Sequence, residues 1–330
     1  MANFVRRIIV RDILVYYREQ IIDYVKSEFN GISDITDIRI NMSAVFKCVY
    51  NGRTCIFKYS LLKADKMMDR TLSEYLFIHA DKMIKLSECI AFPAIYVKRT
   101  LEIKNCTFLL TVEEMLPYTF AQGIMKMHSN CGNDDLKCTS RFLKDLLNLY
   151  LEGEKYGFIS HRDLSFDNLM FDENYNLKMI DLGSAKSTKA ETTMFHIAAP
   201  TKYFYSAPEY ENIHLKNKTE FELIKAEIYT IGLLTLSLLN ALKENLFIEN
   251  SPVCCGIMQW LRENGRQQDF NEKLTEINKR DFINHILINS FFGDDKNVLY
   301  RLLKGMTDKS VSARIPDYYF ILKNIEKGGI

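Results

Sequence analysis

The residues best suited to chemistry lie between His161 and Asn168 and in the acidic turn that begins at Asp181. The first stretch reads His-Arg-Asp-Leu-Ser-Phe-Asp-Asn. Asp163 offers a carboxylate that could accept a proton from a hydroxyl group, while Asn168 and Asp181 offer the oxygen ligands that Mg²⁺ prefers. A base close to a magnesium site is what transfer of a phosphoryl group from ATP requires. The spacing therefore predicts phosphoryl transfer with Asp163 as the base.

Two short strands must hold the two metal ligands at a fixed separation. Residues 169–171 and 177–180 are apolar apart from Lys178, and the polar segment 172–176 joins them. Apolar runs on either side of such a segment are typical of a β-hairpin. Asn168 directly precedes the first strand and Asp181 directly follows the second. Pairing of the strands would bring both ligands to one end of the hairpin.

These segments resemble the signatures of eukaryotic-type protein kinases. The family pattern His-Arg-Asp-Leu-x-x-x-Asn matches residues 161–168, and the pattern Asp-Phe-Gly matches residues 181–183 with Leu182 in place of Phe. A third signature, Ala-Pro-Glu, occupies residues 207–209, 26 positions after Asp181. The resemblance covers residues 35–325 and marks a divergent member of the family.

The resemblance implies an α+β fold with two lobes. The N-lobe would be a small β-sheet with one main helix, at about residues 35–112, and the C-lobe would be larger and mostly helical, at about residues 116–325. An N-terminal extension of residues 1–34 would precede this catalytic domain of residues 35–325, and a tail of residues 326–330 would follow it. Apolar residues at every fourth position over residues 4–29 favour a helix in the extension, and the alternative is a strand, because many of these residues are β-branched.

Strands of the expected N-lobe are predicted at residues 38–40, 45–50, 54–58, 94–97 and 107–112. Asn51-Gly52 is a typical two-residue hairpin turn. By resemblance, Lys58 would neutralise the α- and β-phosphates of ATP. Glu74, in a helix predicted over residues 64–85, would pair with Lys58. The alternatives are a surface charge for Lys58 and a surface pair with Arg70 for Glu74.

The resemblance also places the nucleotide-binding backbone. Glu113 to Met115 would form the hinge that meets the adenine edge, and Val112, give or take one position, would guard the back pocket. The glycine-rich loop of the family aligns with Met42, Ala44 and Lys47, none of which is glycine. A Cβ atom at these positions keeps backbone N–H groups away from phosphate, so the loop would be a partial cradle that the Lys47 ammonium could supplement.

Two departures bear on regulation and specificity. Arg162 directly precedes the base, where the family binds a phosphorylated residue of the activation segment, and Thr188, Thr192 and Thr193 are the candidates. Ser165 stands where serine/threonine kinases carry Lys and tyrosine kinases carry Ala or Arg. Serine/threonine specificity is favoured only because it is the commoner class.

Two further positions resemble anchors of the C-lobe. Glu227 begins a segment similar to the family's Asp-x-Trp-x-x-Gly pattern, with Glu where Asp is usual, and it could still accept hydrogen bonds from backbone amides. Residues 231–242 would form the buried central helix. Arg314 is the expected buried partner of Glu209.

The implied activity is a Mg-ATP-dependent protein kinase that transfers the γ-phosphoryl group to a hydroxyl of a protein substrate. A pseudokinase scaffold or binding module of the same fold is the first alternative, because the nucleotide loop lacks glycine. A small-molecule phosphotransferase is the second. Such enzymes share the His-x-Asp-x-x-x-x-Asn pattern, but they generally lack Ala-Pro-Glu.

Composition limits the partners and the compartment. The chain has 330 residues and a formal net charge of +1, which favours neither nucleic acid nor an anionic membrane. Its eight cysteines show no paired zinc-type spacing, so reduced thiols are expected. The longest apolar run, residues 228–239, is too short to span a bilayer, and no signal peptide is evident. An intracellular protein, cytoplasmic or nuclear, is predicted, and nothing indicates its oligomeric state.

Overall fold

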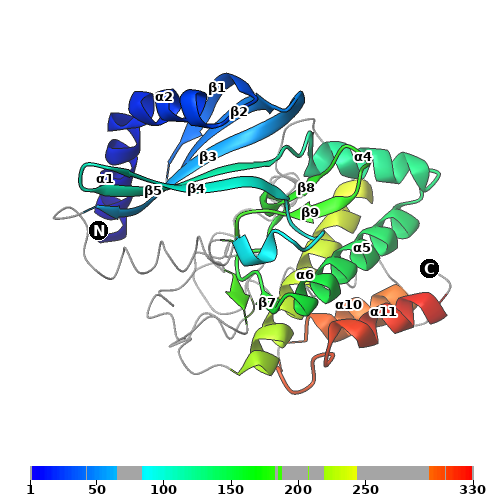
Figure 1. The fold of residues 1–330 in the computed structure, drawn as a ribbon. Coiled ribbons are helices and arrows are strands. Elements are labelled where there is room, and N and C mark those ends of the chain that lie inside the picture. The colour runs from blue at the N-terminus through cyan, green and yellow to red at the C-terminus, as the bar shows by residue number, and fades with distance from the viewer. Residues whose placement is uncertain are drawn as a thin grey trace, which may run out of the picture. The chain divides into compact units, whose positions relative to one another are not determined.

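The computed structural model describes residues 2–41, 43–64, 84–182, 185–187, 207, 219–243, 297–308 and 310–328. The chain divides into two compact units, Met1–Met115 and Leu116–Ile330. The first unit carries a β-sheet and the second is mostly helical (Figure 1). This is the α+β organisation that the sequence predicts.

The first unit is built on a five-stranded antiparallel sheet with the order β1-β2-β3-β5-β4. Asn51 and Gly52 have φ angles of 51° and 76°, as a type I′ turn between β2 and β3 requires. β3 continues through Ala64, the residue at which the following helix was expected to begin. The strands are β1 (Ile32–Ile40), β2 (Ser43–Tyr50), β3 (Arg53–Ala64), β4 (Ile95–Ile103) and β5 (Cys106–Glu114).

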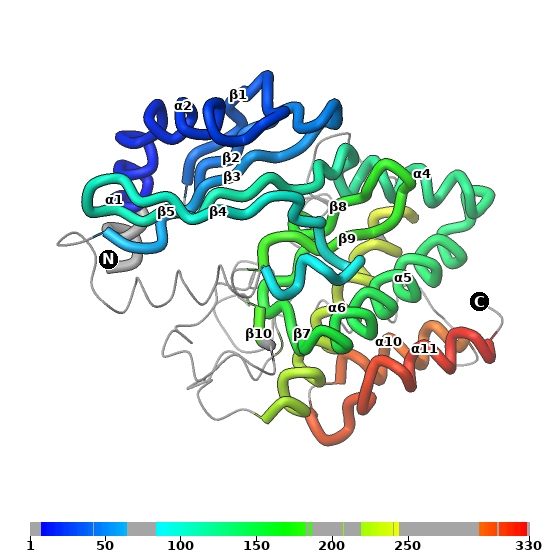
Figure 2. The backbone as a smooth tube through the Cα atoms, in the orientation of Figure 1, coloured from blue at the N-terminus to red at the C-terminus, as the bar shows by residue number. Residues whose placement is uncertain are grey.

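One face of this sheet carries an aromatic core. Phe46, Phe57, Tyr59 and Phe108 are fully buried there, because side chains alternate between the two faces of each strand. Helices α1 (Ala2–Tyr16) and α2 (Arg18–Glu28) lie along the sheet and share this core (Figure 2). Their buried apolar residues include Val10, Ile13, Leu14, Ile21, Ile22 and Val25.

The single helix expected over residues 4–29 is therefore two helices. Tyr17 occupies the break between them and is turned into the core, where its ring packs edge-on against Phe108 with 5.5 Å between centroids. A bend at this residue lets both helices contribute apolar side chains to the same sheet face. The buried residues of α1 and α2, from Val10 to Val25, are thus packed as part of the first unit.

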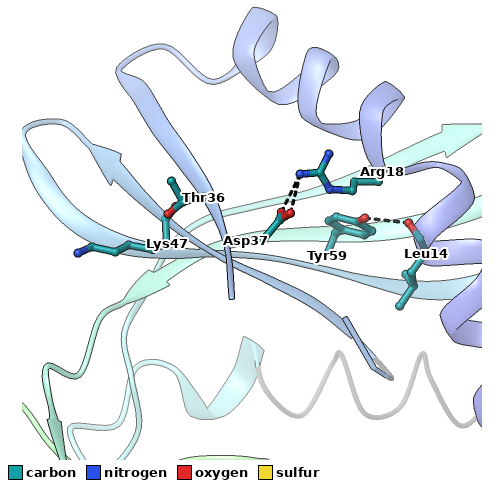
Figure 3. Close-up of polar contacts among 6 residues, drawn as sticks. All are labelled: Leu14, Arg18, Thr36, Asp37, Lys47 and Tyr59. Atoms are coloured by element: carbon teal, nitrogen blue, oxygen red, sulfur yellow. Dashed lines mark hydrogen bonds and ion pairs between the residues drawn. The ribbon is translucent and has the colours of Figure 1, made fainter. Parts of the chain in front are cut away.

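Two polar contacts fasten these helices to the strands (Figure 3). The Tyr59 hydroxyl donates to the Leu14 carbonyl at 2.8 Å, which satisfies an acceptor in the last turn of α1. Burial raises the pKa of this hydroxyl well above its usual range, so it remains protonated and able to donate. The Arg18 guanidinium donates to both carboxylate oxygens of Asp37 in β1, each at 2.8 Å.

The second unit is organised around the buried helix α6 (Glu220–Lys243), which packs against α5 and α10. α6 begins earlier than the helix expected at residues 231–242. No helix within the described ranges is long and apolar enough to cross a membrane. The other helices are α4 (Phe120–Asn130), α5 (Asp135–Lys155), α10 (Val298–Met306) and α11 (Tyr318–Lys327), with the short 3-10 helix η1 (Phe166–Asn168).

Five short strands complete the second unit. β7 and β10 pair antiparallel, and β6, β8 and β9 form a second small sheet. Arg162 and Asp163 follow β7, Asn168 directly precedes β8, and Asp181 follows β9. The strands are β6 (Tyr118–Thr119), β7 (Phe158–Ser160), β8 (Leu169–Phe171), β9 (Leu177–Met179) and β10 (Lys186–Ser187).

Candidate active site

The hairpin predicted to hold the two metal ligands is present. β8 and β9 pair antiparallel, with Leu169 opposite Met179. Asp172 closes the turn by accepting hydrogen bonds from the backbone N–H groups of Asn174 and Asn176, each at 2.8 Å. Ile180 N–H then donates to the carbonyl of Asn168 at 2.9 Å. The pairing therefore continues to the residue directly before Asp181.

Residues 161–168, which are expected to form the catalytic loop, are joined to this hairpin by two hydrogen bonds. The side-chain nitrogen of Asn168 donates to the carbonyl of Asp163 at 2.7 Å. His161 is fully buried, and its Nε2 lies 2.8 Å from the carbonyl of Ile180. Because a carbonyl only accepts, Nε2 carries the proton. Asp163, Asn168 and the residue before Asp181 are thus joined in one hydrogen-bonded frame.

The donor atoms of this frame suit a magnesium ion. Because the amide nitrogen of Asn168 is engaged with Asp163, its oxygen Oδ1 is the atom left for a cation. Asp181 is exposed, with φ 58°. The described residues hold no cluster of three His, Cys, Asp or Glu side chains. Mg²⁺ commonly takes only one or two protein carboxylates and completes its shell with phosphate and water, so this oxygen pair fits it.

The carboxylate of Glu227 in α6 holds residues 160–162 by hydrogen bonds. Its carboxylate is 1% exposed and accepts four hydrogen bonds. Oε1 accepts from the Tyr150 hydroxyl and from His161 N–H at 3.2 Å. Oε2 accepts from the Ser160 hydroxyl at 2.7 Å and from Arg162 N–H at 3.3 Å. Each oxygen therefore binds one hydroxyl and one backbone amide. Sequence reasoning anticipated the amides but not the hydroxyls.

Arg162 lies close to a second cation that sequence reasoning missed. Arg162 is 8% exposed, and Lys186 of β10 pairs with Ser160 of β7, two positions before it. Burial lowers the pKa of Lys186 from its ordinary value, and the positive charge of Arg162 lowers it further. Two neighbouring cations in a partly buried place favour an anion there. The only signal in the sequence was a lysine five positions after Asp181.

Lys58 lies in the middle of the five-stranded sheet. It is paired with Val45 of β2 and Thr111 of β5, so these three side chains share a face. Phe57 and Tyr59 point to the opposite face, which α1 and α2 cover. Lys58 therefore lies on the face opposite to the one that the N-terminal helices occupy.

The residue beside Lys58 on β5 is Thr111. Val112, expected to guard the back pocket, is fully buried on the aromatic face and is paired with Phe57. Thr111 and Glu113 share the Lys58 face, where the Thr111 hydroxyl donates to the Glu113 carboxylate. Thr111, one position before Val112, is therefore the residue of this pair that shares a face with Lys58. The strict two-residue alternation of strand faces decides between the two.

Two of the three residues aligned with the glycine-rich loop, Ala44 and Lys47, lie on opposite faces of β2. Ala44 is a residue of β2, fully buried on the aromatic face and paired with Ile40 and Tyr59. Lys47 is exposed on the Lys58 face. Met42 lies outside the described residues. Among the described positions, therefore, only Lys47 shares a face with Lys58.

The remaining predicted site residues are placed only in part. Met115 is half-buried and is the last residue of the first unit. Glu74, the activation-segment threonines and Glu209 lie outside the described residues. Arg314 is buried, donates to the carbonyls of Asp308 and Lys225, and has its guanidinium 4.9 Å from the centre of the Tyr229 ring.

Comparison with known proteins gives one family match. The family model described as "Protein kinase domain" matches residues 41–316. The chain is 28% identical over 148 residues to a receptor protein-tyrosine kinase of Arabidopsis thaliana, covering 42% of this chain and 14% of that protein. It is 29% identical over 113 residues to a leucine-rich repeat receptor-like serine/threonine-protein kinase of the same plant, covering 34% and 10%.

A third relative matches over more of the chain. It is a wall-associated receptor kinase-like protein of Arabidopsis thaliana, 22% identical over 231 residues, which cover 68% of this chain and 27% of that protein. The matched regions span between 7% and 27% of the length of such curated relatives.

Proposed function

Because the chain belongs to the protein kinase family, we propose that it is an active enzyme that transfers the γ-phosphoryl group of ATP to a hydroxyl of a protein substrate. The observation that carries this proposal is the hydrogen-bonded frame that joins Asp163, Asn168 and the residue before Asp181. Phosphoryl transfer depends mostly on positioning and electrostatic stabilisation, so a rigid frame around a base and two oxygen ligands suits this chemistry.

Each residue has a defined role in the proposal. Asp163 accepts the proton of the substrate hydroxyl. Asn168 and Asp181 would hold magnesium, and Lys58, with Lys47, would bind phosphate oxygens. Glu74 would orient Lys58, and the backbone from Glu113 to Met115 would meet the adenine. Bound Mg-ATP supplies the phosphoryl group and a cation that offsets its charge.

The acceptor is proposed to be a serine or threonine hydroxyl. Relatives named as tyrosine kinase and as serine/threonine kinase both match the chain. Ser165 is 1% exposed, and its hydroxyl has no hydrogen-bond partner within the described ranges. It resembles neither the Lys of one class nor the Ala or Arg of the other, so the preference again rests on the commoner class.

Regulation by phosphorylation is part of the proposal. Arg162 and Lys186 would bind a phosphate on the activation segment, since two partly buried cations supply charge-assisted hydrogen bonds to an anion. An intracellular location also remains a prediction. The cysteines described by the structure are free thiols, which suits a reducing compartment.

A pseudokinase scaffold is the second candidate, and one observation favours it. Ala44, aligned with a glycine of the nucleotide loop, is packed in the aromatic core. If the loop gives phosphate too few backbone contacts, the fold could serve binding alone.

One experiment separates the two candidates. The purified chain is incubated with γ-labelled ATP, Mg²⁺ and a mixed peptide library, with Asp163→Asn as the matched control. We expect labelled peptides, mostly on serine or threonine, from the wild type but not from the variant. A folded wild type that neither labels peptide nor binds ATP at millimolar concentration would establish the scaffold instead.

A further inference from the structure

We propose that Tyr150 is a positioning residue of the catalytic loop and acts through Glu227. Tyr150 lies in α5 and is fully buried. Its hydroxyl donates to Oε1 of Glu227, the oxygen that also accepts the backbone N–H of His161. The inference rests on the proposed function only where turnover is the readout. The position of the loop can be measured without it.

Glu227 relies on its hydroxyl donors because no cation among the described residues forms an ion pair with it. The described residues include no ion pair to this carboxylate, which is buried and relies on four hydrogen bonds. Hydroxyl groups supply half of them. A buried carboxylate left with an unfilled lone pair is costly, so it would turn towards another donor or admit water. Either response would disturb the two amides of the loop.

Tyr150 differs from Ser160 in what it is attached to. Ser160 directly precedes His161, so its hydroxyl moves with the loop that Glu227 holds. Tyr150 belongs to a separate helix, and its ring is packed 5.4 Å from Phe158 and 4.9 Å from Tyr318 of α11. The Tyr150 hydroxyl therefore fixes Glu227 relative to α5 and α11. Because α5 and α11 are not part of the loop, this contact holds Glu227 in place independently of the loop.

The position of Asp163 depends on Glu227 through the backbone conformation of Arg162. Arg162 has φ 61°, in the left-handed region that a residue with a Cβ atom disfavours. The bond from its N–H to Glu227 helps to retain this conformation. If Glu227 turns, Arg162 can relax to an ordinary conformation and shift the next residue, which is the base. A small misplacement of a reacting group is enough to slow catalysis strongly.

The test compares Tyr150→Phe with Thr235→Val. Thr235 is also buried, and its hydroxyl donates only to a carbonyl within α6, so it controls for loss of a buried hydroxyl. We expect Tyr150→Phe to lower kcat by about tenfold or more, because a hydrogen bond to a charged group is lost, with less than about a twofold change in the KM for ATP. Tyr150→Met, which also removes the hydroxyl and keeps an apolar side chain in α5, is a second variant with the same expected result, in case Tyr150→Phe fails to fold.

A second readout does not require activity. Amide hydrogen exchange of peptides that cover residues 158–166 should be faster in Tyr150→Phe than in the wild type and unchanged in Thr235→Val. In a Glu227→Gln background, Tyr150→Phe should add little, since the two residues act as a unit. Exchange and kcat at wild-type levels in Tyr150→Phe, or equal losses in Thr235→Val, would overturn the proposal. A wild type with protected loop amides but no turnover would overturn only the proposed function.

Discussion

Glu227 accepts the backbone N–H of Arg162 at 3.3 Å across a sequence separation of 65 residues. The family usually has the shorter Asp at this position. In this chain Tyr150 and Ser160 also donate their hydroxyls to the Glu227 carboxylate. The loop before the base is therefore held by a buried acid on the central helix of the second unit.

Two replacements of Glu227 should separate the effect of its negative charge from the effect of its side-chain length. Glu227→Gln places an NH₂ group against an amide and a hydroxyl that both donate, so we expect a loss of about 1–3 kcal/mol in the free energy of unfolding. Turnover should fall with it. Glu227→Asp keeps two accepting oxygens and should lose less of both. Denaturant titration and a peptide phosphorylation assay measure the two effects. Equal losses of stability and of turnover in Glu227→Gln and Glu227→Asp would contradict the inference that the Glu227 carboxylate holds residues 160–162 in place.

Asp163→Asn and Asp181→Asn should change different quantities, kcat in the first variant and the affinity for Mg-ATP in the second. Asp163→Asn removes the carboxylate that is proposed to accept the substrate proton in the transition state, so kcat should fall by about 10² to 10⁴-fold with ATP affinity retained. Asp181→Asn removes a carboxylate that is proposed to hold magnesium, so Mg-ATP affinity should weaken. Calorimetric titration with and without Mg²⁺ distinguishes them. Unchanged phosphorylation by Asp163→Asn would exclude this base.

Lys47 and Ala44 should respond differently, because they lie on opposite faces of β2. Lys47→Ala removes an exposed ammonium on the Lys58 face, and ATP should bind about tenfold more weakly if one charge-assisted contact is lost. Ala44→Gly should leave ATP affinity unchanged and destabilise the strand by about 0.5–1 kcal/mol. Lys26→Ala, on exposed α2, is the charge control. Tighter ATP binding in Ala44→Gly would show that Ala44 obstructs the nucleotide.

The N-terminal helices should stabilise the first unit by packing more than by charge. Leu14 is fully buried, so Leu14→Ala should cost about 2–5 kcal/mol. The Arg18 and Asp37 side chains are 33% and 55% exposed, so Arg18→Ala should cost no more than about 1 kcal/mol. Denaturant unfolding of both variants gives the comparison. The reverse order would mean that the ion pair dominates.

Thiol reactivity should follow burial. Burial raises the pKa of Cys48 and of Cys138 to about 12, whereas Cys131 is half-buried. At pH 8 the first two stay protonated, so of these three only Cys131 should react with a thiol reagent in the native state. The stability from burying neutral thiols is present below their ordinary pKa of about 8.5. It is lost as the pH rises towards 12. Mass spectrometry that maps the labelled cysteines, in the native and in the unfolded protein, tests this order of thiol reactivity.

The sequence predicted the strands and the β8–β9 hairpin well because their signals are local. Asn51-Gly52 specifies its own turn, and the polar segment at residues 172–176 separates two apolar runs. The contacts of Tyr150 and Lys186 were missed because they are made with residues far along the chain or on an adjacent strand. No spacing rule reveals such contacts.

The placement of Ala44 shows a different limit. Aligning it with a glycine used the order of residues alone, whereas its neighbours in β2 decide which face it occupies. Val112 and Thr111 differ in the same way, since one step along a strand reverses the side chain. The bend at Tyr17 was also hidden, because the repeat of apolar residues continues through it.

The shared aromatic core has a practical consequence for work with fragments. A fragment of residues 41–330, cut where the family match begins, would lack α1, α2 and β1. β2 would then become an open sheet edge, and Phe46, Tyr59 and Phe108 would lose the apolar layer above them. An unprotected edge beside an exposed apolar face is a template for intermolecular strand pairing. Such a fragment should aggregate, whereas one that keeps the first 40 residues should stay monodisperse in light scattering.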